Sequence, residues 1–152
     1  MLKVHIDADG CPVVLSTVNI AQKSQITPII YCDTSHEIRV EGVETKIVSK
    51  GMDAVDFAIL NTVSKGDIVV TQDYGLAAMV LAKGAYCIDQ NGREFTNENI
   101  DQLLFTRHVG QKIRQAGGRT KGPKKRQKDA NEIYEKKFKQ LCERAKIQAE
   151  KA

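Results

Sequence analysis

Residues 2–12, which read LKVHIDADGCP, decide the fold of this chain. The apolar start of this stretch predicts a buried β-strand that ends near Asp7. Pro12 is typical of the first turn of a helix, where a missing N–H costs nothing. The carboxylates of Asp7 and Asp9 are therefore placed at a corner between a strand and a helix. Ligands of open α/β sheets bind at such corners, and carboxylates crowded together there usually need a cation.

Apolar runs and helical patterns alternate along the first two thirds of the chain. Short apolar runs predict strands at residues 4–6, 27–32, 43–48, 67–71 and 85–88. Apolar residues at helical spacing predict helices at residues 12–23, 53–64 and 73–83, and a further helix that Thr96 caps. This alternation implies parallel βαβ units. We expect a three-layer α/β/α fold whose central parallel sheet has the strand order 3-2-1-4-5, followed by a C-terminal helical extension.

The last third of the chain differs in charge. Residues 1–101 hold 8 Lys/Arg and 14 Asp/Glu, a net charge of −6, whereas residues 102–152 hold 15 and 5, a net charge of +10. Residues 107–128 contain no acid, and a helix there is interrupted by Gly117, Gly118, Gly122 and Pro123. A basic segment of this kind is typical of proteins that bind polyanions, and equally of a solvated surface.

A final helix is predicted to begin near Asp129. It carries one apolar stripe, formed by Tyr134, Phe138, Leu141 and Ala145. We expect an α/β domain over residues 1–105. Residues 106–152 then form a basic segment and a helix that packs on this domain or on a second copy, which would make a homodimer.

Several classes of protein are not expected. No run of about 18 apolar residues is present, so we expect neither a transmembrane helix nor a membrane partner. Charged residues, Lys3 and Asp7 among them, interrupt the N-terminal apolar run, so we expect no signal peptide. The four cysteines form no CxxC pair, which favours a cytoplasmic protein with reduced thiols. His5 alternates with apolar residues and is interpreted as a structural histidine.

Carboxylates recur at the predicted corners of the sheet. Asp73 follows the fourth strand, and Asp53 and Asp56 open the helix after the third. In the order 3-2-1-4-5, strands one and four are neighbours, so Asp7, Asp9 and Asp73 converge. Oxygen-only ligands favour Mg²⁺ or Mn²⁺ over Zn²⁺. We therefore expect such an ion to bind Asp7, Asp9 and Asp73, with Asp53 and Asp56 as the next ligands.

The same aspartates have a second interpretation. Asp53 and Asp73 can be helix N-caps, and Asp56 is favoured by the helix dipole. Asp33 and Asp89 are more typical of turns than of metal sites.

Two other side chains lie beside the expected cluster. The hydroxyl of Thr71 can orient a carboxylate, although a β-branched strand residue is the favoured interpretation. Cys11 precedes a predicted helix, whose dipole would lower the pKa of its thiol. No neighbouring base is evident, so a small buried cysteine is the favoured interpretation.

Three segments carry a resemblance to a known family. Residues 6–12 (IDADGCP), 69–77 (VVTQDYGLA) and 117–123 (GGRTKGP) together resemble the YaiI/YqxD family of bacterial proteins of unassigned function, over nearly the whole chain. That family in turn resembles the PIN-like nucleases, compact α/β/α domains whose acidic residues bind Mg²⁺ or Mn²⁺ and cut RNA.

The resemblance implies roles for individual residues. Asp7 corresponds to the first acid of the PIN site, and Asp73 to the acid after the fourth strand. Asp53 or Asp56 occupies the position on a helix where PIN domains commonly carry an acidic residue. Asp9 and Asp89 are implied as further metal ligands. Many PIN domains use Glu at the helix position, and the shorter Asp side chain reaches less far. The basic segment over residues 117–123 is not a general PIN feature.

Three functions remain open. In the first, the acids are catalytic in a metal-dependent ribonuclease, and the substrate is contacted by Arg119, Lys121, Lys124, Lys125 and Arg126. The second is a non-catalytic RNA-binding module. The third is a phosphatase of the haloacid-dehalogenase type, in which Asp7 attacks phosphorus and Asp9 acts as acid and base. Such phosphatases commonly have Thr at the position that Cys11 occupies in this chain. No catalytic Lys is evident either.

Overall fold

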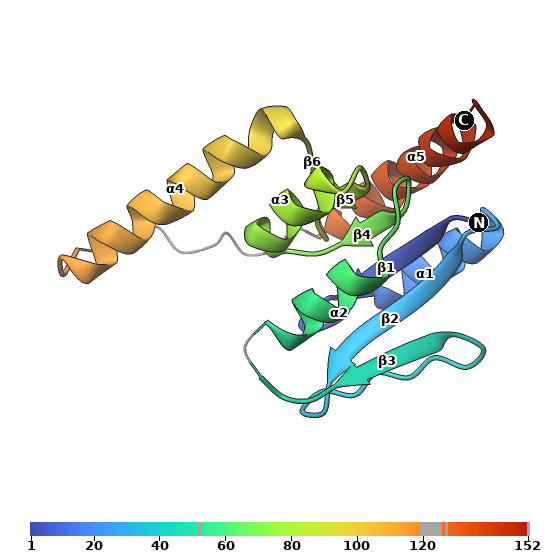
Figure 1. Ribbon diagram of the computed structural model, residues 1–152, viewed down its shortest axis with the longest axis horizontal. Helices are drawn as coiled ribbons and strands as arrows, with labels where there is room; N and C mark the ends of the chain where they lie inside the picture. Colours follow the sequence, from blue (N-terminus) through green and yellow to red (C-terminus); the bar gives the residue numbers. More distant parts are fainter. Residues whose placement is uncertain (52, 119–125, 127, 152) are drawn as a thin grey trace.

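A computed structural model describes residues 1–51, 53–118, 126 and 128–151 of the chain (Figure 1). The strands are β1 (Lys3–Asp7), β2 (Thr27–Asp33), β3 (Glu44–Val48), β4 (Ile68–Val70), β5 (Tyr86–Ile88) and β6 (Glu94–Phe95). The helices are α1 (Val14–Lys23), α2 (Ala54–Thr62), α3 (Tyr74–Ala82), α4 (Asn97–Gln115) and α5 (Ala130–Lys151). Each predicted strand and helix is present, with ends that differ by a few residues.

The six strands form one sheet in the order β3-β2-β1-β4-β5-β6. The first five strands are parallel, which confirms the predicted order 3-2-1-4-5. Strand β6, which pairs antiparallel with β5, was not predicted from the sequence. Asn91 and Gly92 form the predicted turn before it, and Gly92 has a φ of +90° that only glycine adopts easily. A strand of two residues is too short to show any periodicity.

The sheet lies between two layers of helices. Val4 and Ile6 of β1 face a core that α1 and α5 cover. On the opposite face, Tyr31 and Val69 lie in a second core with residues of α2, α3 and α4. The architecture is thus the expected three-layer α/β/α arrangement. Helix α1 begins at Val14, two residues later than predicted, because Pro12 lies in the preceding turn.

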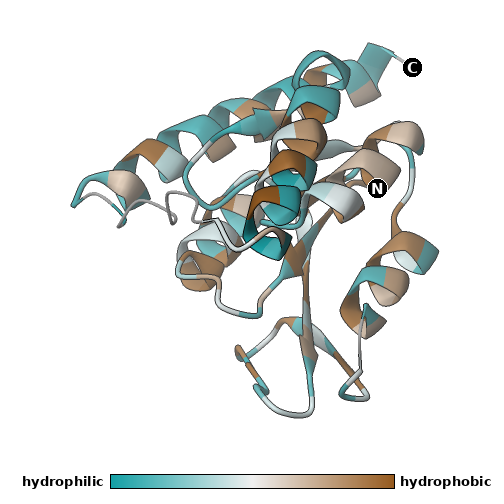
Figure 2. Ribbon diagram, turned by 90° about the vertical axis from the view of Figure 1, so that its left-hand side faces the viewer, coloured by the Kyte–Doolittle hydropathy of each residue, from teal (hydrophilic) through white to brown (hydrophobic). Residues whose placement is uncertain are grey.

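Helix α5 packs on the body of the same chain. The stripe formed by Tyr134, Phe138, Leu141 and Ala145 is buried. The hydroxyl groups of Tyr134 and Thr17 of α1 share a hydrogen bond of 2.7 Å. Hydrophilic and hydrophobic residues alternate along α5, as is typical of a helix that buries one face (Figure 2). The stripe therefore covers the body and is not free to bind a second copy.

Helix α4 extends away from the sheet (Figure 1). Thr96 caps it as predicted, since its hydroxyl accepts a hydrogen bond from Asn99 N while Asn99 Oδ1 accepts one from Thr96 N. The helix continues across residue 105 and ends at Gln115, before Gly117 with its φ of +84°. Its second half is exposed and belongs to the basic segment. Within the described ranges, no helix combines the length and apolarity needed to cross a membrane.

A buried polar network links β1 to its two neighbours. His5 Nε2 lies 2.8 Å from Asp67 Oδ2, and His5 Nδ1 lies 2.7 Å from the hydroxyl of Tyr31. All three side chains are buried. Burial alone would raise the pKa of Asp67, but hydrogen bonds from His5 and from the N–H groups of Ser64 and Lys3 lower it. His5 is thus a structural residue, as predicted.

Candidate metal centre

Two neighbouring parallel strands end at the centre of the site. Strands β1 and β4 are paired with Ile6 opposite Val70, so Asp7 and Thr71 follow at equivalent positions. Because β1 is central, Asp7 is partly buried. This corner is where the order of the strands reverses, the usual position of ligand sites in open α/β sheets.

Thr71 connects the acids of the two strands. Its hydroxyl donates a hydrogen bond of 2.7 Å to Asp7 Oδ2 and accepts one of 3.1 Å from Asp73 N. The hydroxyl is therefore part of the site, and the favoured interpretation of Thr71 as a plain strand residue is wrong. The bond fixes the orientation of the Asp7 carboxylate from the neighbouring strand.

Asp73 is both a helix cap and a member of the acidic cluster. Its Oδ1 accepts a hydrogen bond of 3.1 Å from Leu76 N at the start of α3. A Cβ atom at Gly75 would lie 3.2 Å from the same oxygen, which is closer than most Cβ contacts. The capping interpretation is correct for Asp73, and glycine at position 75 leaves room for this carboxylate.

Helix α2 brings two more acids to Asp73. Asp53 precedes α2 with a left-handed φ of +63°, and its side chain makes no cap hydrogen bond. Asp56 lies in the first turn of α2. One carboxylate oxygen from each of Asp53, Asp56 and Asp73 lies within 4.8 Å of the others. Three of the five predicted metal ligands thus meet closely.

The crowding of these acids affects their protonation. The pKa of Asp56 is raised to about 7, first by burial and then by the neighbouring charge of Asp73, with smaller effects of Asp7 and Asp53. Burial also raises the pKa of Asp7, against the hydrogen bond from Thr71 and together with the charges of Asp73 and Asp9. A cation bound among these carboxylates would remove this repulsion.

Asp9 lies at the edge of the site. Its side chain is 61% exposed, and its Oδ1 is 3.8 Å from Nδ1 of His36. Asp9 also lines an open hollow of about 410 Å³, together with Asp7, Gln72, Asp73, Tyr74 and Arg107. Asp9 thus shares this hollow with Asp7 and Asp73 but is not part of the close group around Asp73.

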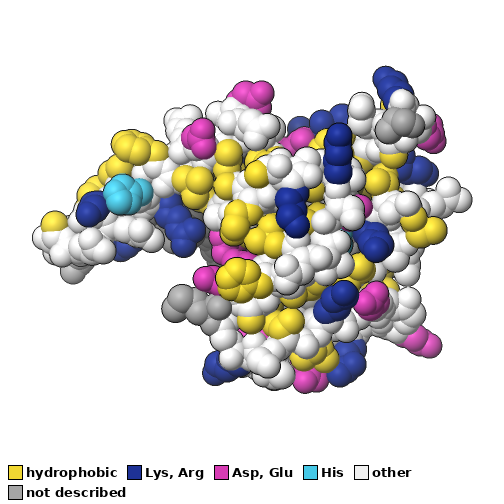
Figure 3. Space-filling view, viewed as in Figure 1, with side chains coloured by type: hydrophobic (Ala, Val, Ile, Leu, Met, Phe, Trp, Pro, Cys, Tyr) yellow, Lys and Arg dark blue, Asp and Glu magenta, His cyan; other side chains and the backbone are white. Residues whose placement is uncertain are grey.

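Arg107 brings a positive charge from α4 to the hollow. Its Nη1 is 4.0 Å from Asp73 Oδ1, and both side chains are at least one third exposed. A notch separates the projecting part of α4 from the body, with acidic side chains at its base and basic side chains on α4 facing them (Figure 3). The hollow therefore combines carboxylates with the guanidinium group of Arg107, which an anionic ligand can reach.

Asp33 and Asp89 have turn roles, as the second interpretation predicted. Asp33 Oδ1 accepts hydrogen bonds from the N–H groups of Ser35 and His36, two and three residues further along the chain. Asp89 Oδ1 accepts hydrogen bonds of 2.9 Å from the N–H groups of Asn91 and Arg93.

Cys11 is partly buried beside Asp7, and burial raises the pKa of its thiol. The expectation that a helix dipole lowers this pKa is wrong, because α1 begins three residues further on. A thiol with a raised pKa is a poor nucleophile at neutral pH.

Of the five predicted substrate contacts, the structure describes Arg126. Arg119, Lys121, Lys124 and Lys125 lie outside the described residues. Arg126 links the β5–β6 turn to α5. Its guanidinium donates hydrogen bonds to the Gln90 carbonyl at 2.6 Å and to Asn91 Oδ1 at 3.0 Å in the turn, and to Asn131 Oδ1 in α5.

The donor set fits a hard divalent cation. Two oxygens bound to one Mg²⁺ lie at most about 4.2 Å apart, because each Mg–O distance is about 2.1 Å. The carboxylate oxygens around Asp73 lie within 4.8 Å of one another, close to this limit. Its ligands are carboxylates alone, which suit Mg²⁺ or Mn²⁺ better than Zn²⁺. Asp53, Asp56 and Asp73 would hold such an ion, and Asp7 lies beside them.

Two residues of this site were not predicted from the sequence. Arg107 belongs to the basic segment, and its position near Asp73 depends on how α4 packs against α3. Gly75 carried no signal, since its effect is the space that it leaves. For Thr71 the spacing T-x-D was a usable signal, because a hydroxyl two residues before a helix cap can bond to the backbone of that cap.

Comparisons with known proteins agree on one family. Residues 5–144 match a family model described as "Uncharacterized BCR, YaiI/YqxD family". A "UPF0178 protein" of Exiguobacterium sibiricum is 56% identical over 140 residues, which cover 92% of this chain and 96% of the relative. A "UPF0178 protein" of Clostridium acetobutylicum is 45% identical over 96% of this chain and 100% of its own length. No solved structure matches the chain.

Proposed function

The chain belongs to the YaiI/YqxD family, and we propose that it hydrolyses RNA phosphodiester bonds with the help of Mg²⁺ or Mn²⁺. One observation carries the proposal. Carboxylates from three separate segments, after β1, at the start of α2 and at the start of α3, gather at one corner of the sheet. Such crowding raises the free energy of the folded chain, and a bound cation offsets this cost.

The acids of the cluster would have different roles in this reaction. Asp53, Asp56 and Asp73 would hold the ion, and Asp7, oriented by Thr71, lies beside it on the central strand. When bound, Mg²⁺ or Mn²⁺ would supply a nucleophilic water at neutral pH and would neutralise charge on the phosphate. One oxygen of Asp7 is fixed by Thr71 and the other is free of protein hydrogen bonds among the described residues, so Asp7 could orient an attacking water.

The hollow over the acids suits a phosphodiester. Arg107 is loosely paired with Asp73 and can contact a phosphate oxygen instead. Tyr74 lines the same hollow and would supply an aromatic side chain beside a base. RNA is the proposed polymer because the family resembles the PIN-like nucleases. The basic residues in the second half of α4, together with those in the rest of the basic segment, would neutralise the flanking phosphates.

The phosphatase alternative has weaker support. It requires a cationic side chain beside the attacking Asp7, and no lysine in the described part of the chain forms an ion pair with that residue. Asp9, the acid and base of that scheme, points to the exposed edge near His36. The non-catalytic alternative shares every RNA contact with the proposal, so only turnover separates the two.

Cleavage of labelled RNA tests the proposal. The full chain is freed of metal with EDTA and then assayed on a fluorescent single-stranded RNA with Mg²⁺, Mn²⁺ or neither. Asp7→Asn is compared with Asp101→Asn, a control that removes an exposed acid from α4, away from the hollow. We expect metal-dependent cleavage that falls at least a hundredfold in Asp7→Asn and is unchanged in the control. RNA binding is expected to persist in both variants.

Two results would overturn the proposal. Cleavage by Asp7→Asn at the wild-type rate in Mn²⁺ would remove the acidic cluster from the chemistry. Binding of RNA by the wild-type chain without turnover, under every metal and on several RNA substrates, would favour the non-catalytic module.

A further inference from the structure

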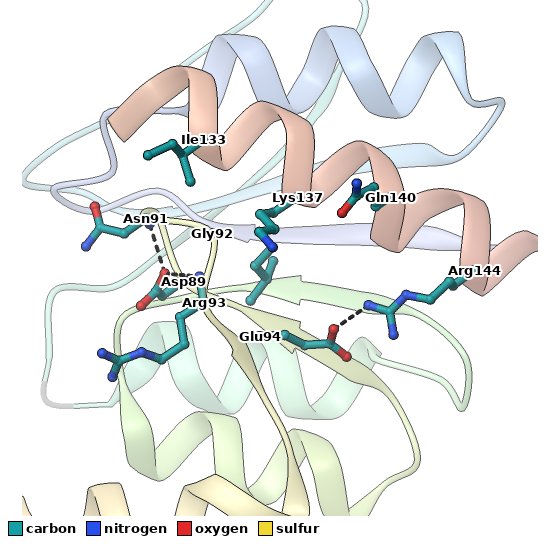
Figure 4. Close-up of a pocket in the computed structure, with 10 residues that line it drawn as sticks. Asp89, Asn91, Gly92, Arg93, Glu94, Ile133, Lys137, Gln140 and Arg144 are labelled. Carbon is teal, nitrogen blue, oxygen red and sulfur yellow. Dashed lines mark hydrogen bonds and ion pairs between the residues drawn. The ribbon is translucent and has the colours of Figure 1, made fainter. Parts of the chain in front are cut away.

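A second, larger hollow lies on the other side of the β5–β6 turn. It is an open groove of about 660 Å³ between that turn and α5 (Figure 4). Its polar lining includes Asn91, Arg93, Glu94, Lys137, Gln140 and Arg144. None of these residues belongs to the acidic cluster, and the groove has no role in the chemistry proposed above.

Both acidic side chains that line the groove already have hydrogen-bond or ion-pair partners. Asp89 accepts hydrogen bonds from the N–H groups of the turn, and Glu94 forms an ion pair with Arg144. Arg144 is held by this ion pair, whereas Lys137 is not paired in this way in the described part of the chain. Lys137 points from α5 into the gap toward the turn (Figure 4). Among the described residues, Lys137 forms no ion pair. Three basic side chains face two occupied acids, so the groove carries a net positive charge.

Gly92 shapes the groove around Lys137. A Cβ atom at Gly92 would lie 3.1 Å from Lys137 Cγ and 3.3 Å from Tyr134 Cα. The glycine therefore lets the aliphatic stem of Lys137 lie against the turn. The stem is supported there, which limits the entropy that the ammonium group loses on binding an anion.

The groove and the acidic cluster share the β5–β6 turn. Gln90 lines a small pocket with Asp7 and Cys11, whereas Asn91 and the residues after it line the groove. Arg126 bonds to both Gln90 and Asn91, so its guanidinium lies where the two sites meet. Four cations, which we call the basic track, lie around this turn and the groove: Arg126, Arg93, Lys137 and Arg144.

We propose that the basic track binds the phosphates of the RNA strand on one side of the scissile bond. The inference rests on the proposed function, since it assigns a second contact region for the same substrate. The groove is open, polar and positive, so it suits a solvated polyanion better than an apolar ligand. Phosphate contacts of this kind add affinity and fix the register of the strand, without reading its sequence.

Affinity for RNA of different lengths tests the track. Binding of single-stranded RNA of 4 to 20 nucleotides is measured in EDTA by fluorescence anisotropy, at several salt concentrations. The double variant Lys137→Gln/Arg144→Gln is compared with Lys139→Gln, which removes an exposed lysine of α5 outside the groove. Circular dichroism checks that both variants fold, and Lys137→Arg provides the conservative replacement.

The expected effect depends on the length of the RNA. The double variant is expected to bind the longest RNA roughly tenfold more weakly than the wild-type chain, with a salt slope smaller by about 1.4, the value for two lost single-strand phosphate contacts. The shortest RNA, which fits the acidic site alone, is expected to lose nothing. With metal present, KM for long RNA rises while kcat stays the same. Lys137→Arg is expected to retain wild-type affinity.

Three other outcomes distinguish failure of the basic track from failure of the proposed function. Unchanged affinity and salt slope in the double variant, with cleavage intact, would overturn the basic track and leave the proposed function standing. An equal loss for every length, together with chemical-shift changes of Lys137 on addition of inorganic phosphate, would assign the groove to a free phosphate ligand instead. A wild-type chain that neither binds nor cleaves RNA would overturn both proposals.

Discussion

The hydroxyl of Thr71 donates a hydrogen bond of 2.7 Å to Asp7 Oδ2, across the boundary between two parallel strands. The same hydroxyl accepts a hydrogen bond from the N–H of Asp73, so one oxygen atom links two segments of the acidic cluster, the end of β1 and the start of α3. The bond favours the ionised form of Asp7 against the burial that raises its pKa. Thr71 is therefore a positioning residue for the carboxylate that the proposed chemistry needs most.

Replacing Thr71 tests this role. Thr71→Val keeps the shape of the side chain but removes the donor, so we expect a 10- to 100-fold loss of Mn²⁺ affinity and of RNA cleavage. Thr71→Ser restores the donor and is expected to recover most of both. Mn²⁺ affinity is measured by titration calorimetry, which needs no RNA. Equal Mn²⁺ affinities for the Val variant and the wild-type chain would contradict the positioning role.

The raised pKa of Asp56 predicts a stability that depends on pH. Its carboxyl titrates near pH 7 in the folded chain and near pH 4 when unfolded, so its ionisation destabilises the fold as the pH rises from about 4 to 7. Asp56→Asn removes this cost. We expect the metal-free variant to be more stable than the wild-type chain at pH 8, on the order of 1 kcal/mol or about 2–4 °C in Tm. Near pH 4 the difference is expected to vanish.

Mn²⁺ is expected to reverse this order. The ion binds the folded wild-type chain and stabilises it, whereas Asp56→Asn offers one ligand fewer and gains less. Thermal unfolding at pH 8 with and without Mn²⁺ measures both effects. A variant that is less stable than the wild-type chain in EDTA would show that Asp56 has a structural partner instead of repelling Asp73.

The acids of the site were predictable because of where they stand in the chain. Asp7 and Asp73 each follow an apolar run, and parallel strands in the order 3-2-1-4-5 bring such positions together. The approach of α2 is different. It depends on the left-handed backbone of Asp53, and nothing local in the sequence predicts that conformation for an aspartate.

The groove beside α5 was not predictable for a related reason. Lys137 and Gly92 are far apart in the chain, and their contact depends on the docking of α5 against α1. The apolar stripe predicted that α5 packs on something, but a stripe does not specify its partner. The short strand β6, which forms the other wall of the groove, gave no periodic signal.

The buried pair of His5 and Asp67 predicts a loss of stability in acid. Because the pKa of Asp67 is lowered by folding, its contribution is present above about pH 4 and is lost as the pH falls below that value. Asp67→Asn removes the charge that faces His5 and is expected to cost about 3 kcal/mol at pH 7. Urea unfolding at pH 7 and pH 3 checks this, and the cost is expected to shrink at pH 3. A constant difference would assign the loss to packing.

The packing of α5 against the body predicts how stability responds to protein concentration. Phe138 is fully buried and stacks on Tyr134 with ring centroids 5.5 Å apart. Phe138→Ala is expected to cost about 3–5 kcal/mol, while the control Ile147→Ala, at a side chain that is 53% exposed, is expected to change stability by less than about 0.5 kcal/mol. Because the stripe is covered within one chain, the unfolding midpoint of the wild-type protein is expected to stay constant over a hundredfold range of concentration. A midpoint that rises with concentration would indicate that α5 also joins two copies.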